Sequence, residues 1–243
     1  METKDFNYKY DNVVQIDEQA ASRKFLGSVF AWMFVAMIIS GITTYFFTTD
    51  IKYLQLIIDP VQGGLTGFGY FAIFSPILFS LVMNFGFNKL SFPVLVALFI
   101  AYSAIIGISL SLVFLVYTAA SILNVFVAGI VIFAGMAIAG YYTTQDLSSW
   151  GTLLRYGVTG VIAASILNFW IGGDSLSYII GLVGSVVFIG LTAYYMQMLK
   201  QIGAQAESGT ESTNKLALMG ALSLYVTLIN LILSLLRLFG RRR

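Results

Sequence analysis

The sequence predicts an all-α integral membrane protein with seven transmembrane helices. Its residues are 58% hydrophobic and only 10% charged, with a mean hydropathy of +0.88. A soluble domain normally carries about 25% charged residues. The apolar residues also gather in runs of about 20, the length at which a helix crosses about 30 Å of hydrocarbon. None of these runs alternates like a barrel strand, and backbone groups in lipid must bond within their own segment, so the runs are predicted to be helices.

Seven runs meet the length requirement, and they fix the predicted domain organisation. They cover residues 25–47, 68–87, 93–116, 118–141, 152–171, 176–198 and 216–239. Residues 1–24 hold nine of the 24 charges, so we expect a polar, mobile tail there with a short amphipathic turn near Gln15–Ser22. The membrane domain is expected to span 25–240, followed by a basic end at 241–243. The first apolar run is too long for a signal peptide and lacks a cleavage site, so it is predicted to be retained.

The connections carry the local signals that divide these helices. The third and fourth runs are nearly continuous, and a break is predicted at Val116–Ala119 because 49 residues would be too long for one span. Pro76 predicts a kink inside the second span, whereas Pro93 lies at a helix start, where proline is tolerated. Between Thr48 and Gly67, a short interfacial helix is expected before Asp59-Pro60, broken by Gly63-Gly64.

The two remaining loops have different predicted roles. Gln201–Lys215 is small and polar, which is typical of a flexible hydrated link. In the loop 143–151, Asp146, Ser148 or Ser149 is expected to cap the fifth span by accepting from its first free N–H groups.

Basic residues near the helix ends favour a cytoplasmic N-terminus. One face carries Arg23, Lys24, Lys89, Arg155, Lys200 and Lys215, and the other carries Lys52 alone before the terminal arginines. With seven spans the C-terminus would lie outside, although a re-entrant last segment would place both ends inside.

Composition excludes several classes of function. The net charge of +2 and the scattered basic residues make nucleic-acid binding a poor hypothesis. The absence of Cys and His removes thiol chemistry, the usual zinc sites and His-based triads, so we expect no cofactor and no enzymatic activity. Small residues recur at four-residue spacing at Gly135/Ala139 and Gly160/Ala164, where they predict close helix packing or a gating contact.

Polar side chains within the spans are the candidate functional residues. In the last span Ser223, Thr227, Asn230 and Ser234 follow one another at spacings of 4, 3 and 4, which predicts one polar stripe ending at Arg237. Other spans contribute Ser185 and Tyr195, and the candidate polar path comprises Tyr117, Ser121, Asn124, Ser165, Asn168, Thr192, Gln197, Ser223, Asn230 and Ser234. A central last helix would bury them. Two interpretations stay open: interhelical hydrogen bonding, worth about 0.6 kcal/mol each, or a permeation path. All eleven acids fall in the tail or loops, so a strong Ca²⁺ site is not expected.

The chain resembles the Bax inhibitor-1 family of transmembrane Bax inhibitor motif proteins, in its bacterial inner-membrane branch. The resemblance runs from about Lys24 to Arg243, and its most specific segments are SLVFLVYTAASI (111–122), GYYTTQDLSSWGTLL (140–154), ASILNFW (164–170), GLTAYYMQMLK (190–200) and ALSLYVTLINLILSLLRLFGRR (221–242). The resemblance implies seven helices with the last one surrounded by six. It also implies cytoprotection and ion homeostasis, with a pH-sensitive Ca²⁺ leak in some members and binding of a membrane-anchored AAA protease in others.

The departures from the family pattern fall on its pH sensor. The resemblance places the sensor's two aspartates at the positions that hold Tyr195 and Thr227 in this chain. Paired acids share a proton and titrate abnormally, which tyrosine and threonine cannot do near neutrality, although they can hydrogen-bond one another. A basic pair expected in the loop before Asp146 is also missing. The sequence thus predicts a leak pathway for Ca²⁺ or other cations, or its remnant, with weak pH dependence. The alternative is a regulatory protein that binds membrane partners such as the AAA protease.

Overall fold

Eight helices make up most of the described chain. The computed structural model describes residues 3–60, 63–206 and 209–242, with side chains from Gln19 onward. The helices are α1 (Thr3–Thr49), α2 (Ile51–Ile57), α3 (Gly67–Gly86), α4 (Phe92–Val116), α5 (Ala119–Tyr142), α6 (Ser148–Ile171), α7 (Asp174–Gln205) and α8 (Glu211–Phe239). Within these residues seven helices are long and apolar enough to cross a membrane, as predicted.

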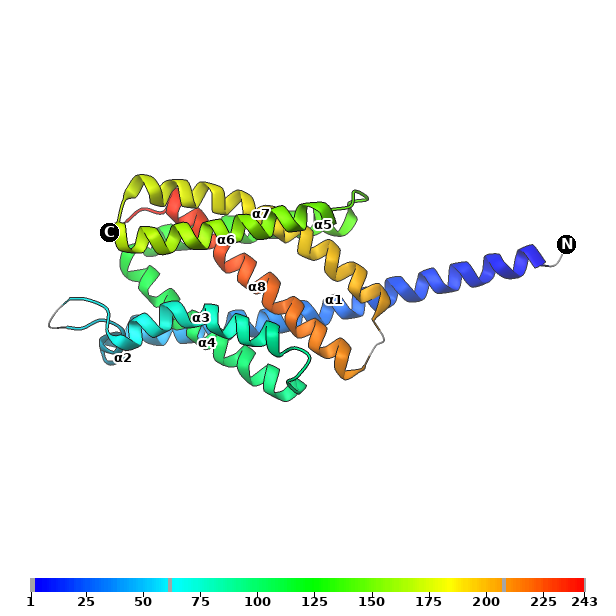
Figure 1. Ribbon diagram of the computed structural model, residues 1–243, viewed down its shortest axis with the longest axis horizontal. Helices are drawn as coiled ribbons and strands as arrows, with labels where there is room; N and C mark the ends of the chain where they lie inside the picture. Colours follow the sequence, from blue (N-terminus) through cyan, green and yellow to red (C-terminus); the bar gives the residue numbers. More distant parts are fainter. Residues whose placement is uncertain (1–2, 61–62, 207–208, 243) are drawn as a thin grey trace.

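Helix α1 begins much earlier than the sequence suggests. It starts at Thr3 and extends beyond the other helices, where a polar, mobile tail with a short amphipathic turn was expected (Figure 1). Hydropathy marks only the part of a helix that lies in lipid, so it does not detect a helix that continues into water. An amphipathic turn was expected near Gln15–Ser22. Its side chains up to position 18 lie outside the described residues, and so does Arg243 at the other end of the chain.

The short connections follow the predicted local signals. Helix α2 confirms the short helix after the first span, and its N-terminus is capped by Asp50, whose carboxylate accepts from the Lys52 N–H at 2.9 Å. The break between α4 and α5 falls at Tyr117 and Thr118, and Thr118 caps α5. Pro93 lies in the first turn of α4, and α3 continues as one helix through Pro76.

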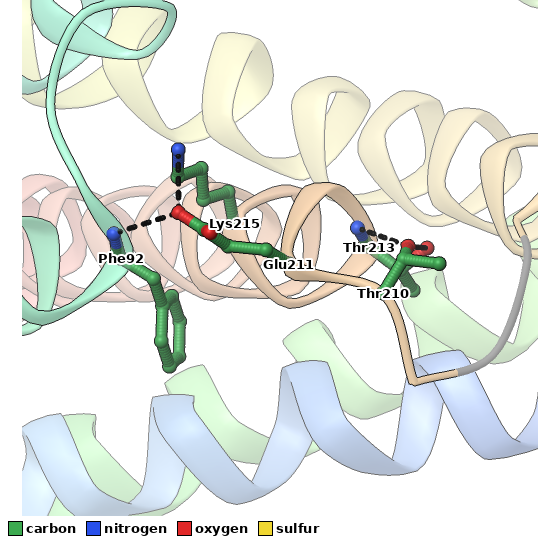
Figure 2. A network of polar contacts seen from close by, with 5 residues as sticks. All are labelled: Phe92, Thr210, Glu211, Thr213 and Lys215. Carbon is green, nitrogen blue, oxygen red and sulfur yellow. Dashed lines mark hydrogen bonds and ion pairs between the residues drawn. The ribbon is translucent and has the colours of Figure 1, made fainter.

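The link predicted at Gln201–Lys215 is much shorter in the structure. Helix α7 continues to Gln205 and α8 begins at Glu211. Figure 2 shows the contacts that start α8 so early: the Thr213 N–H donates to the hydroxyl of Thr210, and Glu211 pairs with Lys215 at 2.9 Å. Glu211 also accepts from the Phe92 N–H at 3.3 Å, which joins the start of α8 to the start of α4. Capping and an i,i+4 ion pair therefore extend the helix beyond its apolar part.

Helix α8 is the most buried span. Sixty-seven per cent of its most apolar window is buried, against 6% for α6. It packs against α1, α4, α5 and α7, while α3 packs on α4 and α6 packs on α7 (Figure 1). This burial agrees with an inner position for the last helix; that all six other spans surround it stays a prediction.

Neighbouring helix backbones approach most closely at Gly140 and Gly107, not at Gly135 and Gly160, where the four-residue spacing predicted close packing. A Cβ on Gly140 of α5 would lie within 2.8 Å of the Ala193 backbone in α7, and one on Gly107 of α4 would meet the backbone of Ser40 in α1. Around Gly135 and Gly160 the space is open. Those two positions face outward, so the repeat of small residues did not identify the packing faces.

Candidate functional site

Helices α7 and α8 pack antiparallel, and two glycines fix their register. Gly184 of α7 lies against Ser234 of α8, and Gly220 of α8 lies against Leu199 of α7. In this register Thr227 lies at the level of Leu191 and Thr192. Tyr195 is about one helical turn away, roughly 5 Å along the axis.

The two positions of the sensor pair are consequently not hydrogen-bonded to each other. The Thr227 hydroxyl, 2% exposed, donates to the carbonyl of Ser223 in its own helix at 2.7 Å. The Tyr195 ring is half-buried and packs beside Tyr194, with 5.4 Å between the ring centroids. The described side chains do not form the hydrogen bond that was considered possible between Tyr195 and Thr227, because the helix register separates them by a turn.

The predicted polar stripe of α8 divides into two rows. Thr227 and Ser234 are buried, and Ser234 faces α7. Ser223 and Asn230 belong instead to a half-exposed row, which we call the open row, that continues at intervals of three and four residues. The open row consists of Leu216, Met219, Ser223, Val226, Asn230, Leu233 and Arg237. Residues spaced by 4, 3 and 4 positions cover a broad arc of the helix surface. The spacing alone did not show that one side of this arc is buried and the other is half-exposed.

Several polar side chains of α7 and α8 bond to their own helix. Ser223, Thr227 and Asn230 donate to carbonyls four residues earlier, as do Ser185 and Thr192 in α7. These bonds use the hydroxyl donors and one amide N–H of Asn230 but leave oxygen lone pairs free. Interhelical hydrogen bonding is therefore not the role of these side chains, and the interhelical bonds lie elsewhere, as from Thr44 to the Gly107 carbonyl at 2.8 Å.

The other members of the candidate path are scattered. Ser165 accepts from Arg237 at 3.0 Å, and Ser121 accepts from the Arg241 N–H at 2.8 Å. Tyr117 is buried and forms a backbone bridge with Arg242, whereas Asn124 is exposed on the outside of α5. Asn168 keeps a buried Oδ1 without a partner in the described chain. The structure therefore does not join all ten predicted residues into one path.

Gln197 holds the loop between α5 and α6. Its Nε2 donates to the carbonyl of Gln145 at 2.7 Å, and its Oε1 accepts from the Leu147 N–H at 2.9 Å. One turn later, the Lys200 ammonium donates to the carbonyl of Tyr141 at 2.8 Å and lies 4.8 Å from the centre of its ring. The sequence placed Gln197 in a polar path, but its contacts identify it as the anchor of this loop.

In the described chain, acidic residues lie in the part of α1 before its apolar span, at the starts of α7 and α8, and in the loops. Asp146 accepts from the Ser148 N–H at 2.9 Å, which confirms the predicted bond to the first N–H of this helix although the N-cap residue is Leu147; the hydrogen bonds from Ser148 lower the pKa of Asp146. Asp174 and Glu211 occupy the first turns of α7 and α8. No group of three or more acids is arranged to hold a metal ion in the described residues.

Known proteins place the chain in a family. The family model described as inhibitor of apoptosis-promoting Bax1 matches residues 22–243. The chain belongs to the Bax inhibitor-1 family. The inner membrane protein YbhL of Escherichia coli K12 is 36% identical over 234 residues, which cover 96% of this chain and 97% of YbhL. An uncharacterized protein of Borreliella burgdorferi is 36% identical, with 90% and 93% covered, and one of Caulobacter vibrioides is 32% identical, with 98% and 99% covered.

One end of this Bax inhibitor-1 family protein carries contacts that the sequence did not indicate. After α8 the chain turns back on the start of α5, where the Thr118 N–H donates to the Arg241 carbonyl at 3.1 Å. Arg242 forms an ion pair with Asp174 at the start of α7, and the hydrogen bond that its guanidinium donates to the Asp174 carboxylate raises the pKa of Arg242. From the sequence, the terminal arginines gave information only about membrane orientation. The pairing of Arg242 with Asp174, 68 residues away, has no local sequence signal.

Proposed function

We propose that this Bax inhibitor-1 family protein is a slow leak pathway for cations whose activity hardly depends on pH between about 6 and 8. The observation that carries the proposal is the α7–α8 contact. The two positions of the family's acidic pair hold Tyr195 and Thr227, and the Thr227 hydroxyl is bound within its own helix. Neither side chain changes charge near neutrality, so this contact supplies no proton-controlled latch.

The open row of α8 is the part of the bundle best suited to such a pathway. Ser223 and Asn230 are half-exposed, and their oxygens keep acceptor capacity. Neutral oxygens bind cations weakly, and Ca²⁺ prefers six to eight oxygen ligands, several of them carboxylates. Arg237 ends the row with a positive charge that repels cations. These features support a low rate and little selectivity.

Flux into liposomes tests the proposal. Purified protein is reconstituted in liposomes loaded with a Ca²⁺-sensitive dye, and initial rates are compared at pH 6, 7 and 8. We expect a slow flux above protein-free liposomes that changes less than about twofold, because no group titrates at the contact. A double variant, Tyr195→Asp with Thr227→Asp, is expected to gain pH dependence. Absence of any flux above the protein-free control contradicts the proposal.

A regulatory role is the second candidate, and the long helix α1 favours it. Its first turns extend beyond the bundle (Figure 1), where a membrane partner can reach them. Family resemblance suggests a membrane-anchored AAA protease as that partner. Crosslinking and affinity purification from native membranes test this role. It is supported if the protease is recovered at a near-stoichiometric level and this recovery is lost when residues 1–18 are deleted. Equal recovery with the truncated chain contradicts a role for this segment.

We further propose that the protein lies in the bacterial inner membrane with a cytoplasmic N-terminus, and that it is not an enzyme. The name of its relative YbhL and the basic residues beside the loops support the location and orientation. The chain has no cysteine, so single cysteines report accessibility directly. In cells with a permeable outer membrane, an impermeant maleimide should label Ser175→Cys but not Ser212→Cys. The reverse pattern contradicts the orientation.

A further inference from the structure

A groove opens where α7 begins and α8 ends. Its volume is about 600 Å³, and its lining includes Asp174, Ser175 and Tyr178 from α7 together with Arg237 and Arg242. The groove thus combines two guanidinium groups, one carboxylate and two hydroxyl groups. Its net charge is positive.

The guanidinium of Arg237 lies in the groove without an ion-pair partner in the described chain. Its guanidinium donates to the neutral hydroxyl of Ser165 at 3.0 Å, and in the described chain no carboxylate forms an ion pair with it. Its side chain is only half-exposed. A half-buried guanidinium with free donors is matched best by a planar or tetrahedral oxyanion.

The second arginine can turn to the same ligand at little cost. Arg242 is paired with Asp174, but the two side chains are 49% and 87% exposed. Exposed ion pairs contribute little stability, so exchanging Asp174 for a stronger anion is not costly. Two guanidinium groups then converge on one ligand.

Exposed aromatic side chains at this end of the bundle are typical of the depth of lipid headgroups. Tyr178 in its lining is 54% exposed, and Trp170 at the end of α6 is 73% exposed. Tyr and Trp gather at the membrane–water interface, where their rings meet lipid and their polar atoms meet water. An anion bound here is therefore within reach of the bilayer surface.

We propose that this groove binds a phosphate group through Arg237 and Arg242, supplied by an anionic phospholipid headgroup or by free phosphate. Phosphate oxygens accept charge-assisted hydrogen bonds from guanidinium donors, and the Ser175 and Tyr178 hydroxyls add neutral donors. The site shares Arg237 with the end of the open row, but it takes a ligand of opposite charge to that of the cation leak proposed above, and lipid binding is measured separately from cation flux.

Lipid binding to delipidated full-length protein in detergent tests the site. Native mass spectrometry compares phosphatidylglycerol with phosphatidylcholine, each titrated alone and then with inorganic phosphate. We expect preference for phosphatidylglycerol, and Arg237→Gln should weaken its binding about tenfold. Arg241→Gln is the matched control, because it removes an equal charge from the same segment but from outside the groove lining. We expect that variant to stay within about twofold of the unaltered protein.

A second variant acts in the opposite direction. Asp174→Asn removes the only acid from the groove lining and should tighten phosphatidylglycerol binding, which keeps the test decisive if Arg237→Gln fails to fold. Competition by inorganic phosphate at millimolar concentration assigns the site to free phosphate, and lack of competition assigns it to the lipid. The proposal is overturned if neither ligand binds, if Arg241→Gln weakens binding as much as Arg237→Gln, or if Asp174→Asn fails to tighten it.

Discussion

Replacing Gln197 with methionine should release the loop between α5 and α6. The change keeps the size of the side chain but removes the donor to the Gln145 carbonyl and the acceptor for the Leu147 N–H. Gln145 is exposed, so its carbonyl regains water, whereas the Leu147 N–H is half-buried. A buried group left without a partner costs about 1–3 kcal/mol, so we estimate about 1.4 kcal/mol for this site.

That free energy corresponds to about a tenfold rise in local opening, because 1.36 kcal/mol is a factor of ten. Hydrogen exchange read by mass spectrometry on peptides covering residues 143–150 measures the rise. Gln201→Met is the matched control: the same substitution is made on the same helix at an exposed residue. Gln197→Glu retains an acceptor for the Leu147 N–H and should exchange more slowly than Gln197→Met. Unchanged exchange in Gln197→Met, or an equal rise in Gln201→Met, would refute the anchoring role.

Three further predictions concern packing, the sensor position and a helix cap. Gly140→Ala should lower the free energy of unfolding by about 1–3 kcal/mol, measured by thermal unfolding of the purified protein, because its Cβ meets the α7 backbone. Gly135→Ala is the control and should not lower it, since the space around Gly135 is open. Equal effects of the two substitutions would contradict this packing. Thr227→Val should leave Ca²⁺ flux unchanged, since the hydroxyl bonds only its own helix; a large change in the rate would reveal a direct role. The lowered pKa of Asp146 means that its cap is complete above about pH 4 and is lost as the pH falls through the lowered value. Protection from exchange at the start of α6, corrected for the intrinsic pH dependence of amide exchange, should therefore fall only in acid, and Asp146→Asn should flatten this pH dependence.

Hydropathy and local turn signals predicted the membrane domain well. Seven spans, the break between α4 and α5 and the short helix α2 all appear where the sequence placed them. These features depend on residues that are close together in the sequence, such as the length of an apolar run, a helix cap or a proline. The same rules missed the extensions of α1, α7 and α8, since a helix that continues into water is held by caps and ion pairs such as Glu211–Lys215 and leaves no hydropathy signal.

The candidate site was harder to predict because it depends on contacts between distant segments. Periodicity placed Ser223, Thr227, Asn230 and Ser234 on one broad arc, but the depth of each residue depends on which helix covers it. The bonds of Gln197 to the loop join residues 50 and 52 positions apart, and the pair of Arg242 with Asp174 joins residues 68 apart. No local pattern encodes such pairs.

The pH profile of Ca²⁺ flux tests the central claim most directly. Liposomes containing the unaltered protein are compared at pH 6, 7 and 8 with liposomes containing the double variant Tyr195→Asp with Thr227→Asp. Because neither Tyr195 nor Thr227 changes charge between pH 6 and 8, we predict a slow, nearly constant flux for the unaltered protein and a pH-dependent flux for the double variant. A steeply pH-gated flux through the unaltered protein would contradict this account.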